Sequence, residues 1–353
     1  MDQVRLSATA RVSLPTPLVY FNKLTNHFAE HGEVTKAGHK GQIELSYGIA
    51  TIEAGDDTLL LSAESDDETG LAYMKHAIAE HVIEFARRER PKIVWAGDGT
   101  SGGALPYFRE MSVVGVSTLS PMMRRVRLRG KDLRRFSYGG LHIRLLIPPE
   151  QVAPQWPIAG EDGRPIWPAE EHKLTARVYT IRNIDVERGE VDIDIVIHDE
   201  TPGSVWVMNA QPGDIVGLTG PGGGGVPDAD WQLLAGDETA LPAIGRIIEE
   251  LPAEAKVVAR IEVDSALEEQ RFDHRCQLDL QWLHRNGRKA GTTTLLQDAV
   301  RSVEFPKDQQ RIFAWAGCEF TAFKAIRGYL RKERKLDRKQ HLVVSYWRQG
   351  VEG

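Results

Sequence analysis

Three side chains in the run Arg177-Val178-Tyr179-Thr180 could together hold a phosphorylated, ring-bearing cofactor. On a β-strand, positions i and i+2 share one face and position i+3 turns to the other. The Arg177 guanidinium can therefore fork onto a pyrophosphate while the Tyr179 ring covers a flavin ring or its ribityl chain. The Thr180 hydroxyl or amide can reach the flavin edge, and we assign the next residue, Ile181, to the same site. An ordinary strand with an exposed Arg and a half-buried Tyr would have the same sequence.

A second candidate for phosphate binding follows in the segment Thr201–Trp206. Gly203 would let the backbone approach an anion closely, and successive amides with the Ser204 hydroxyl could bind pyrophosphate at a helix start. We include Trp206 in this site, together with His198, which ends the preceding strand. The alternatives are a capped helix start and a structural strand-end histidine.

A third candidate is the run Gly236-Asp237-Glu238-Thr239-Ala240. Gly236 ends an apolar strand and Thr239 could cap the helix that follows, which leaves a helix N-terminus suited to the phosphates of a nicotinamide dinucleotide. Asp237 and Glu238 fit this role poorly because carboxylates repel phosphate. The same residues would also make a good acidic first turn of a structural helix.

The periodicity of the chain predicts a multidomain protein that combines α+β and α/β folds. Residues 1–96 read as a small α+β domain, and residues 97–112 as a linker. Residues 113–228 consist of short strands separated by turns, which predicts an antiparallel β-barrel that binds the flavin. Residues 229–353 alternate strands with helices, which predicts an α/β nucleotide-binding-like domain with a parallel sheet. The barrel strands expected are Val113–Arg129, Leu141–Ile147, Ala176–Asp185, Glu190–Ile197 and Asp214–Thr219.

Composition narrows the class of protein. A content of 41% hydrophobic and 27% charged residues is typical of a globular protein, and no apolar run is long enough to span a membrane. The start of the chain lacks the features of a signal peptide, so we expect a cytoplasmic protein. Cys276 and Cys318 match no metal-binding or redox spacing, and we expect structural roles for them. A net charge of -6 argues against nucleic acid as a partner.

Several motifs, in this order, resemble the siderophore-interacting proteins, a branch of the ferredoxin–NADP reductase superfamily. The residues that carry the resemblance are His142–Pro148, Arg177–Arg182, Ile197–His198, Thr201–Trp206, Ala235–Ile244, Trp315–Gly317 and Tyr346–Gly350. The family pattern at the second candidate site is Gly-Pro-Ala-Ser-x-Trp, and this chain has Thr-Pro-Gly-Ser-x-Trp. The shifted glycine favours Ser204 over Gly203 as the ligand there.

The resemblance implies an FAD-dependent ferric-siderophore reductase that passes electrons from NAD(P)H through FAD to Fe(III) and releases Fe(II). It also implies that Trp347, on the last strand, shields the flavin face. The alternatives are a non-catalytic flavin-bearing siderophore-binding protein and a flavin reductase coupled to ferredoxin. Residues 7–96 resemble a small domain of uncharacterised function that is found alone or fused to this family.

An anionic ferric chelate requires a basic patch beside the flavin of this acidic protein. The candidates are Arg144, where the family often has Lys, together with Arg246 and Arg348. For the electron donor, Glu262 at the end of the second strand of the α/β domain favours NADH. Arg285 at the end of the third favours the 2′-phosphate of NADPH, which we prefer.

Histidines near the start of the chain are the remaining group that could bind a metal. His27 and His31 would share a helical face at i and i+4, but no third histidine or carboxylate follows at a clear spacing. We therefore expect solvated histidines and no protein-bound metal.

Overall fold

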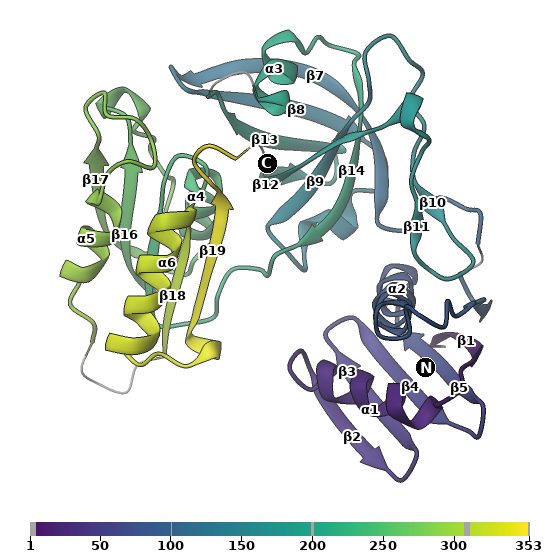
Figure 1. Cartoon of the computed structure of the whole chain (residues 1–353). Helices are drawn as coiled ribbons and strands as arrows, with labels where there is room; N and C mark the ends of the chain where they lie inside the picture. The colour runs from purple at the N-terminus through teal and green to yellow at the C-terminus, as the bar shows by residue number, and fades with distance from the viewer. Residues whose placement is uncertain (1–4, 100, 199–200, 307–310, 352–353) are drawn as a thin grey trace. The chain divides into compact units, whose positions relative to one another are not determined.

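The structure is a computed structural model that describes residues 5–99, 101–198, 201–306 and 311–351. Contacts divide the chain into two units, which are described separately. The first comprises residues 1–108 and 149–173, and the second comprises residues 109–148 and 174–353 (Figure 1). Within the described residues, no helix is long and apolar enough to cross a membrane.

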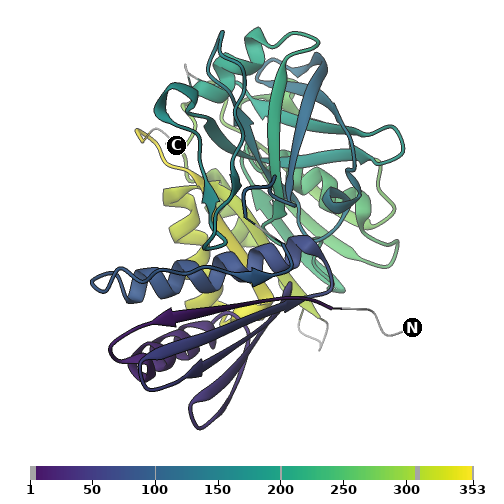
Figure 2. The same ribbon diagram turned by 90° about the vertical axis from the view of Figure 1, so that its right-hand side faces the viewer.

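The first unit is built on a six-stranded sheet in the order β2-β3-β4-β5-β1-β6. Its strands are β1 (Leu6–Ser13), β2 (Glu33–Ala37), β3 (Lys40–Leu45), β4 (Gly48–Ala54), β5 (Thr58–Ser65) and β6 (Ala96–Gly97). Alternate residues of β1, β4 and β5 are buried, so one face of the sheet carries the core. Helices α1 (Pro17–Phe28) and α2 (Glu68–Phe85) cover that face, and Figure 2 shows the long α2 lying across it.

A chain excursion, residues 149–173, leaves the barrel sequence and belongs to the first unit. It holds the short hairpin β10 (Ile158–Ala159) and β11 (Pro165–Ile166). The Trp95 backbone and ring nitrogens donate to the carbonyls of Glu161 and Asp162 at 3.0 and 2.9 Å. These bonds join the excursion to the end of the first domain.

The second unit begins with a closed antiparallel barrel in the order β12-β13-β8-β7-β14-β9. Its strands are β7 (Phe108–Ser120), β8 (Met123–Gly130), β9 (His142–Ile147), β12 (Thr175–Asp185), β13 (Glu190–Val196) and β14 (Ile215–Gly222). The predicted strand Val113–Arg129 is wrong in one respect: Pro121 and Met122 break it into the β7–β8 hairpin. Proline cannot donate to a ladder, which explains the break. Helix α3 (Pro202–Asn209) packs against β13.

The second unit ends in a parallel five-stranded sheet in the order β17-β16-β15-β18-β19. Its strands are β15 (Trp231–Gly236), β16 (Lys256–Val263), β17 (Gln277–His284), β18 (Ile312–Glu319) and β19 (His341–Trp347). Helix α4 (Leu241–Glu250) covers one face, and α5 (Leu295–Ser302) and α6 (Phe320–Gly328) cover the other. The predicted fold class is confirmed.

Strand order in this sheet reverses between β15 and β18, since β16 and β17 lie on one side and β19 on the other. Ligands of such sheets bind outside the carboxyl ends of the strands at this reversal. Gly236 and Gly317 pair there. Their neighbours in sequence are therefore the natural candidates for a site.

Candidate functional site

The Arg177 run lies on β12, and Tyr179 meets the loop that starts α3. A Cβ atom at Gly203 would collide with the Tyr179 hydroxyl, so glycine is what permits this contact. Burial raises the pKa of Tyr179 to about 12. The two segments predicted to hold the flavin are thereby brought together.

The Arg177 side chain is half-buried, and its guanidinium donates to the Ala176 carbonyl at 2.9 Å. None of the ion pairs among the described residues involves Arg177, so no described carboxylate competes with an external anion for its charge. Val178 beside it is 62% exposed. A free cation, an exposed apolar side chain and a helix start fit a dinucleotide with a pyrophosphate and a flat ring.

The Ser204 hydroxyl is engaged within its own loop. The Ser204 hydroxyl accepts from the His198 amide at 3.2 Å and from the Thr201 hydroxyl at 3.0 Å, and it lies 3.3 Å from the Val196 carbonyl. Ser204 is buried, so its hydroxyl shapes the loop rather than facing a ligand. Of the two residues, Gly203 is the one whose type the geometry requires, contrary to the expectation from the family pattern. Trp206 packs partly against the barrel core.

Thr180 and Ile181 also contribute mainly through the fold. Both side chains are buried, and the Ile181 amide donates to the Leu141 carbonyl at 2.8 Å. The Ile181 carbonyl accepts from Arg246 at 3.0 Å. The backbone groups of Ile181 are therefore already paired.

Trp347, the predicted flavin cover, is fixed by Asp237 and faces His198. Its indole nitrogen donates to Asp237 Oδ2 at 2.9 Å. Its ring lies at 29° to the His198 ring, with 6.4 Å between the centroids. The last strand and the barrel loop are thus brought to one place, as the prediction requires.

Asp237 lies at the strand reversal and is 5% exposed. Its carboxylate also accepts from the Thr239 amide at 3.0 Å, the Thr239 hydroxyl at 2.5 Å and the Glu319 amide at 3.0 Å. Burial raises the pKa of this carboxyl group. Thr239 does not cap α4, because its hydroxyl is used by Asp237 and Ala240 occupies the cap position.

This arrangement corrects the expectation that Gly236 to Ala240 bind a dinucleotide phosphate. The Thr239 amide, which would bind a phosphate, already donates to Asp237, and the Ala240 amide donates to the Asp237 carbonyl. A Cβ atom at Gly236 would collide with Ala240 and the Gly317 carbonyl, so this glycine permits close packing. The residues present do not fit a phosphate at this helix start.

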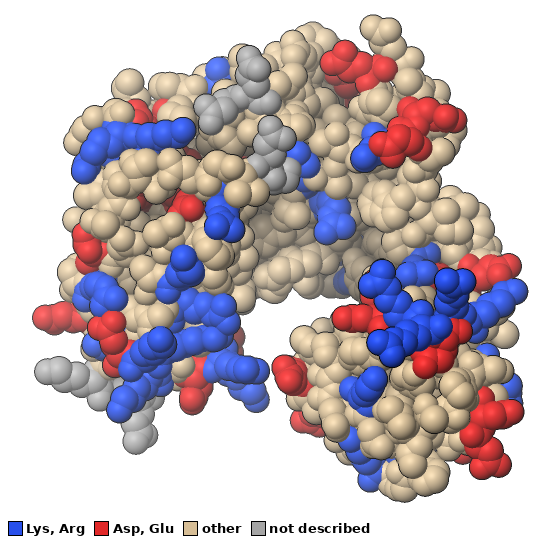
Figure 3. Space-filling view, in the orientation of Figure 1, with Lys and Arg blue, Asp and Glu red and all other residues tan. Residues whose placement is uncertain are grey.

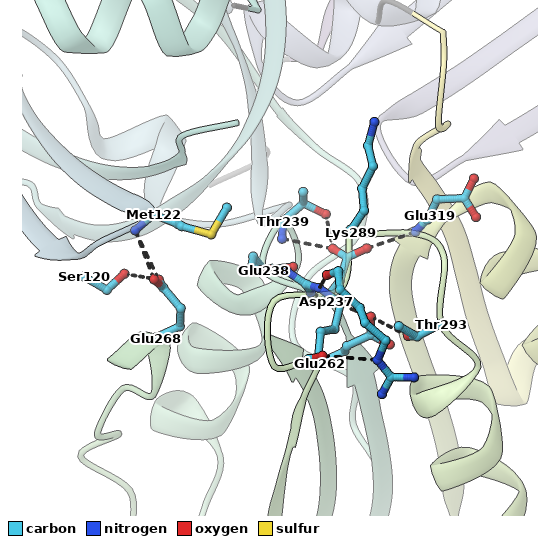
Figure 4. Close-up of polar contacts among 12 residues, drawn as sticks. Ser120, Met122, Asp237, Glu238, Thr239, Glu262, Glu268, Lys289, Thr293 and Glu319 are labelled. Atoms are coloured by element: carbon cyan, nitrogen blue, oxygen red, sulfur yellow. Dashed lines mark hydrogen bonds and ion pairs between the residues drawn. The ribbon is translucent and has the colours of Figure 1, made fainter. Parts of the chain in front are cut away.

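Glu238 belongs to a buried ionic network at the same edge of the sheet. It forms an ion pair with Arg285, whose other nitrogen lies 3.7 Å from Glu262. Glu262 in turn accepts from the Thr293 hydroxyl at 2.9 Å. Burial raises the pKa of both Glu238 and Glu262. Figure 4 shows these carboxylates gathered together, whereas Lys289 points away from them.

The network corrects the argument for NADPH. Arg285 is 2% exposed, so it is not available to hold a 2′-phosphate. Glu262 is buried as well and cannot meet a ribose. Neither residue that we used to choose between NADH and NADPH is free.

The three predicted substrate arginines do not form one patch. Arg144 is exposed on β9 and has no ion pair to a described residue. Arg246 is 7% exposed, with Glu250 at 2.6 Å and the Ile181 carbonyl at 3.0 Å, so it cannot meet a large chelate. Arg348 is exposed and lies over the Phe320 ring at 4.8 Å. From the sequence, Arg348 could instead pair with Glu352, which lies outside the described residues.

A contact that we did not predict joins the barrel to the last strand. His142 Nε2 lies 2.6 Å from the Tyr346 hydroxyl. Burial, with a smaller effect from Arg246, lowers the pKa of His142 to about 4, so this imidazole is neutral near pH 7. Both residues belong to motifs that carried the family resemblance, and those motifs are the sequence feature that could have pointed to this contact.

Near the start of the chain, His81 of α2 joins His27 and His31, with 4.3 Å between the His27 and His81 ring centroids. Phe28 and Phe85 adjoin them, so the rings form one cluster instead of being separately solvated. No group of three or more potential ligands in the described part of the chain is arranged to hold a metal ion.

Family comparisons agree with this architecture. The siderophore-interacting FAD-binding domain matches residues 112–225, and the siderophore-interacting protein domain matches residues 229–350. A family described as an uncharacterised protein conserved in bacteria matches residues 9–96. Ferric vibriobactin reductase of Vibrio cholerae is 35% identical over 253 residues, which are 69% of this chain and 90% of that protein.

This chain belongs to the siderophore-interacting protein family.

Other members of the siderophore-interacting protein family extend the comparison. The NADPH-dependent ferric-chelate reductase of Escherichia coli is 30% identical and aligns with 68% of this chain and 92% of its own length. The crystal structure of a siderophore utilization protein from T. fusca has a TM-score of 0.58 and 40% identity, covering 69% of this chain and 94% of that one. The barrel is therefore the FAD-binding domain of this family.

Proposed function

We propose that this protein is an FAD-dependent ferric-siderophore reductase that uses NAD(P)H and releases Fe(II) in the cytoplasm. The observation that carries the proposal is the contact of Tyr179 with the start of α3 on the FAD-binding barrel, with Arg177 two residues earlier on the same strand. Relatives at 35% and 30% identity are named as a ferric vibriobactin reductase and a ferric-chelate reductase. Reduction of Fe(III) weakens its binding to hard oxygen ligands, which frees the metal.

The protein residues bind, orient and shield in this reaction. Bound FAD supplies the redox chemistry, because it can take electrons in pairs and give them up singly. Arg177 would neutralise the pyrophosphate, and Tyr179 would lie along the cofactor. Trp347 would exclude water from the ring, in the orientation that Asp237 fixes. No side chain is required as an acid, base or nucleophile.

Steady-state kinetics on the full chain would test the proposal. FAD-loaded protein, NADPH or NADH, and a ferric siderophore are mixed with a ferrous-iron trap, and the coloured Fe(II) complex is followed. We expect Fe(II) to form at a rate that depends on protein, FAD and donor. Siderophore binding without Fe(II) formation by any donor would support a non-catalytic siderophore-binding protein instead.

A protein donor is worth testing in the same assay. Asp237, Glu238 and Arg285, the residues predicted to bind a dinucleotide, are paired with one another or with the backbone. This pairing favours including a reduced ferredoxin beside the two nicotinamide donors. A faster rate with ferredoxin than with either dinucleotide would assign the protein to ferredoxin-coupled reductases.

A further inference from the structure

The last strand, β19, is an edge of the five-stranded sheet. It pairs with β18 on one side, and no other described strand pairs with it. An edge strand presents unpaired N–H and C=O groups that can bind another extended segment.

A groove of about 380 Å³ follows this edge. Five consecutive residues of β19, His341 to Ser345, line one wall, and Phe323, Arg327 and Arg331 line the other. Consecutive strand residues point to opposite faces of a sheet. A groove that touches all five therefore runs along the backbone edge and not over one face.

The spacing of the helical wall matches that of a strand. Phe323, Arg327 and Arg331 recur every four residues on α6 and the turn after it, about 6 Å apart along a helix. Alternate side chains on one face of a strand are about 6.8 Å apart. Three alternate side chains of an added strand would therefore meet these three residues in order.

The two arginines of the groove have no carboxylate partner among the described residues. Arg327 lies over the Phe323 ring at 5.5 Å, and Arg331 donates to His341 Nε2 at 2.9 Å. His341 Nδ1 lies 2.7 Å from the Asp337 carbonyl, so this ring donates there and is neutral. Neither arginine forms an ion pair within the described ranges. Both cations are thus held in place with their charge uncompensated.

The surroundings are also basic, although the whole chain carries a net charge of -6. Lys and Arg side chains gather over the lower part of α6 and β19 in Figure 3. The nearby acidic residue Glu333 is already paired with Arg301 at 2.8 Å. An anionic segment is the complementary partner.

We propose that the α6–β19 groove binds an extended acidic segment of a partner protein, which adds to β19 as a sixth strand. Alternate residues of the segment would be apolar, acidic and acidic, opposite Phe323, Arg327 and Arg331. The alternative is that these arginines bind no partner and only prevent aggregation through the exposed sheet edge. This interaction goes beyond the proposed reductase activity and does not depend on it.

A pair of synthetic peptides tests the proposal on the full chain. One has the sequence Thr-Leu-Thr-Glu-Thr-Glu-Thr and the other the reverse order, since β19 could accept either direction. Each carries a fluorophore, and binding is followed by anisotropy at low and high salt. We expect saturable binding of one order that weakens with salt, and slower amide hydrogen exchange in residues 341–345.

Matched variants separate a groove from a general charge effect. R327Q/R331Q should weaken binding about tenfold or more, since it removes two charge-assisted contacts. R87Q/R88Q makes the same change in net charge on exposed arginines elsewhere and should bind like wild type. Replacing both peptide Glu by Lys, or N-methylating alternate peptide amides, should abolish binding without altering the protein.

Three results would overturn the proposal. One is the absence of saturable binding of either peptide to wild-type protein. The second is equal weakening by the two double variants. The third is concentration-dependent dimerisation of the chain through residues 341–345, which would make a second copy the occupant.

Discussion

At the scale of single residues, the contact between Gly203 and Tyr179 is the most constraining feature of the cofactor site. Gly203→Ala should weaken FAD binding and cost about 1–3 kcal/mol of stability, because the new methyl group collides with the Tyr179 hydroxyl. Tyr179→Phe removes that hydroxyl and should restore stability in the double variant. Gly115→Ala, where a Cβ meets nothing, is the control. Chemical denaturation and FAD titration measure both effects, and additive losses in the double variant would contradict the contact.

Arg177 is the residue whose charge we expect FAD to use. Arg177→Ala should weaken FAD binding by about 1.5–3 kcal/mol, since a charge-assisted contact to the pyrophosphate is lost. Arg188→Ala is a suitable control because Arg188 is exposed and pairs only with Asp185 at 3.6 Å. Titration of cofactor-free protein with FAD gives both affinities. Equal affinities in the two variants would remove Arg177 from the site.

Protonation of His142 should make the free energy of unfolding depend on pH. Its pKa is about 4 in the folded chain and about 6.5 when unfolded, so the unfolded state takes up the proton first as pH falls. The stability contributed by neutral His142 is therefore fully present above pH 6.5. As the pH falls from 6.5 to 4, the free energy of unfolding decreases by up to about 3 kcal/mol on this account. Urea unfolding at pH 7 and 4.5 should show a smaller loss in His142→Gln than in wild type. The same pH dependence in both would contradict this, and exposed His198→Gln is the control.

At the scale of elements, the buried network ties the carboxyl end of β15 to the segment after β17. Arg285→Ala would leave Glu238 and Glu262 buried without their cation, which should cost about 3–5 kcal/mol. Lys289→Ala, at an exposed position in the same loop, should change little. Denaturant unfolding measures both. A normally stable Arg285→Ala protein with altered preference between NADH and NADPH would restore the role that we first assigned.

The elements themselves were largely predictable from sequence, but the partners of buried polar groups were not. The predicted strands Leu141–Ile147 and Glu190–Ile197 agree with β9 and β13 to within one residue at each end, because a run of strand-forming residues between turns is a local signal. Asp237 was read as a cofactor contact because acidic residues at a helix start look alike in sequence whether they face solvent or not. Its bond to Trp347 joins residues 110 positions apart, and no local pattern encodes that distance.

At the scale of the whole molecule, the acidic net charge makes the local basic side chains matter for substrate choice. Arg348→Glu should raise KM more for an anionic ferric tris-catecholate than for a near-neutral ferric hydroxamate, because attraction grows with the charge of the chelate. The difference should fade at 1 M salt, where the Debye length is about 3 Å. Arg246→Gln is not a useful comparison because Arg246 is buried. Arg188→Glu, at an exposed position, is the matched control. Equal KM changes for both chelates at both salt levels would leave the substrate site unassigned.

The excursion of residues 149–173 has a consequence for the order in which the protein is made. Synthesis runs from the N-terminus, so the first unit cannot complete its contacts until residue 173 has left the ribosome. By then β7, β8 and β9 have already emerged, while β12, which pairs with β9, has not. Synthesis of the second unit therefore begins before the first unit is complete, so the two units cannot fold strictly one after the other. Shortening the excursion should for this reason slow the maturation of both units, although it changes no residue of β12 or of the five-stranded sheet.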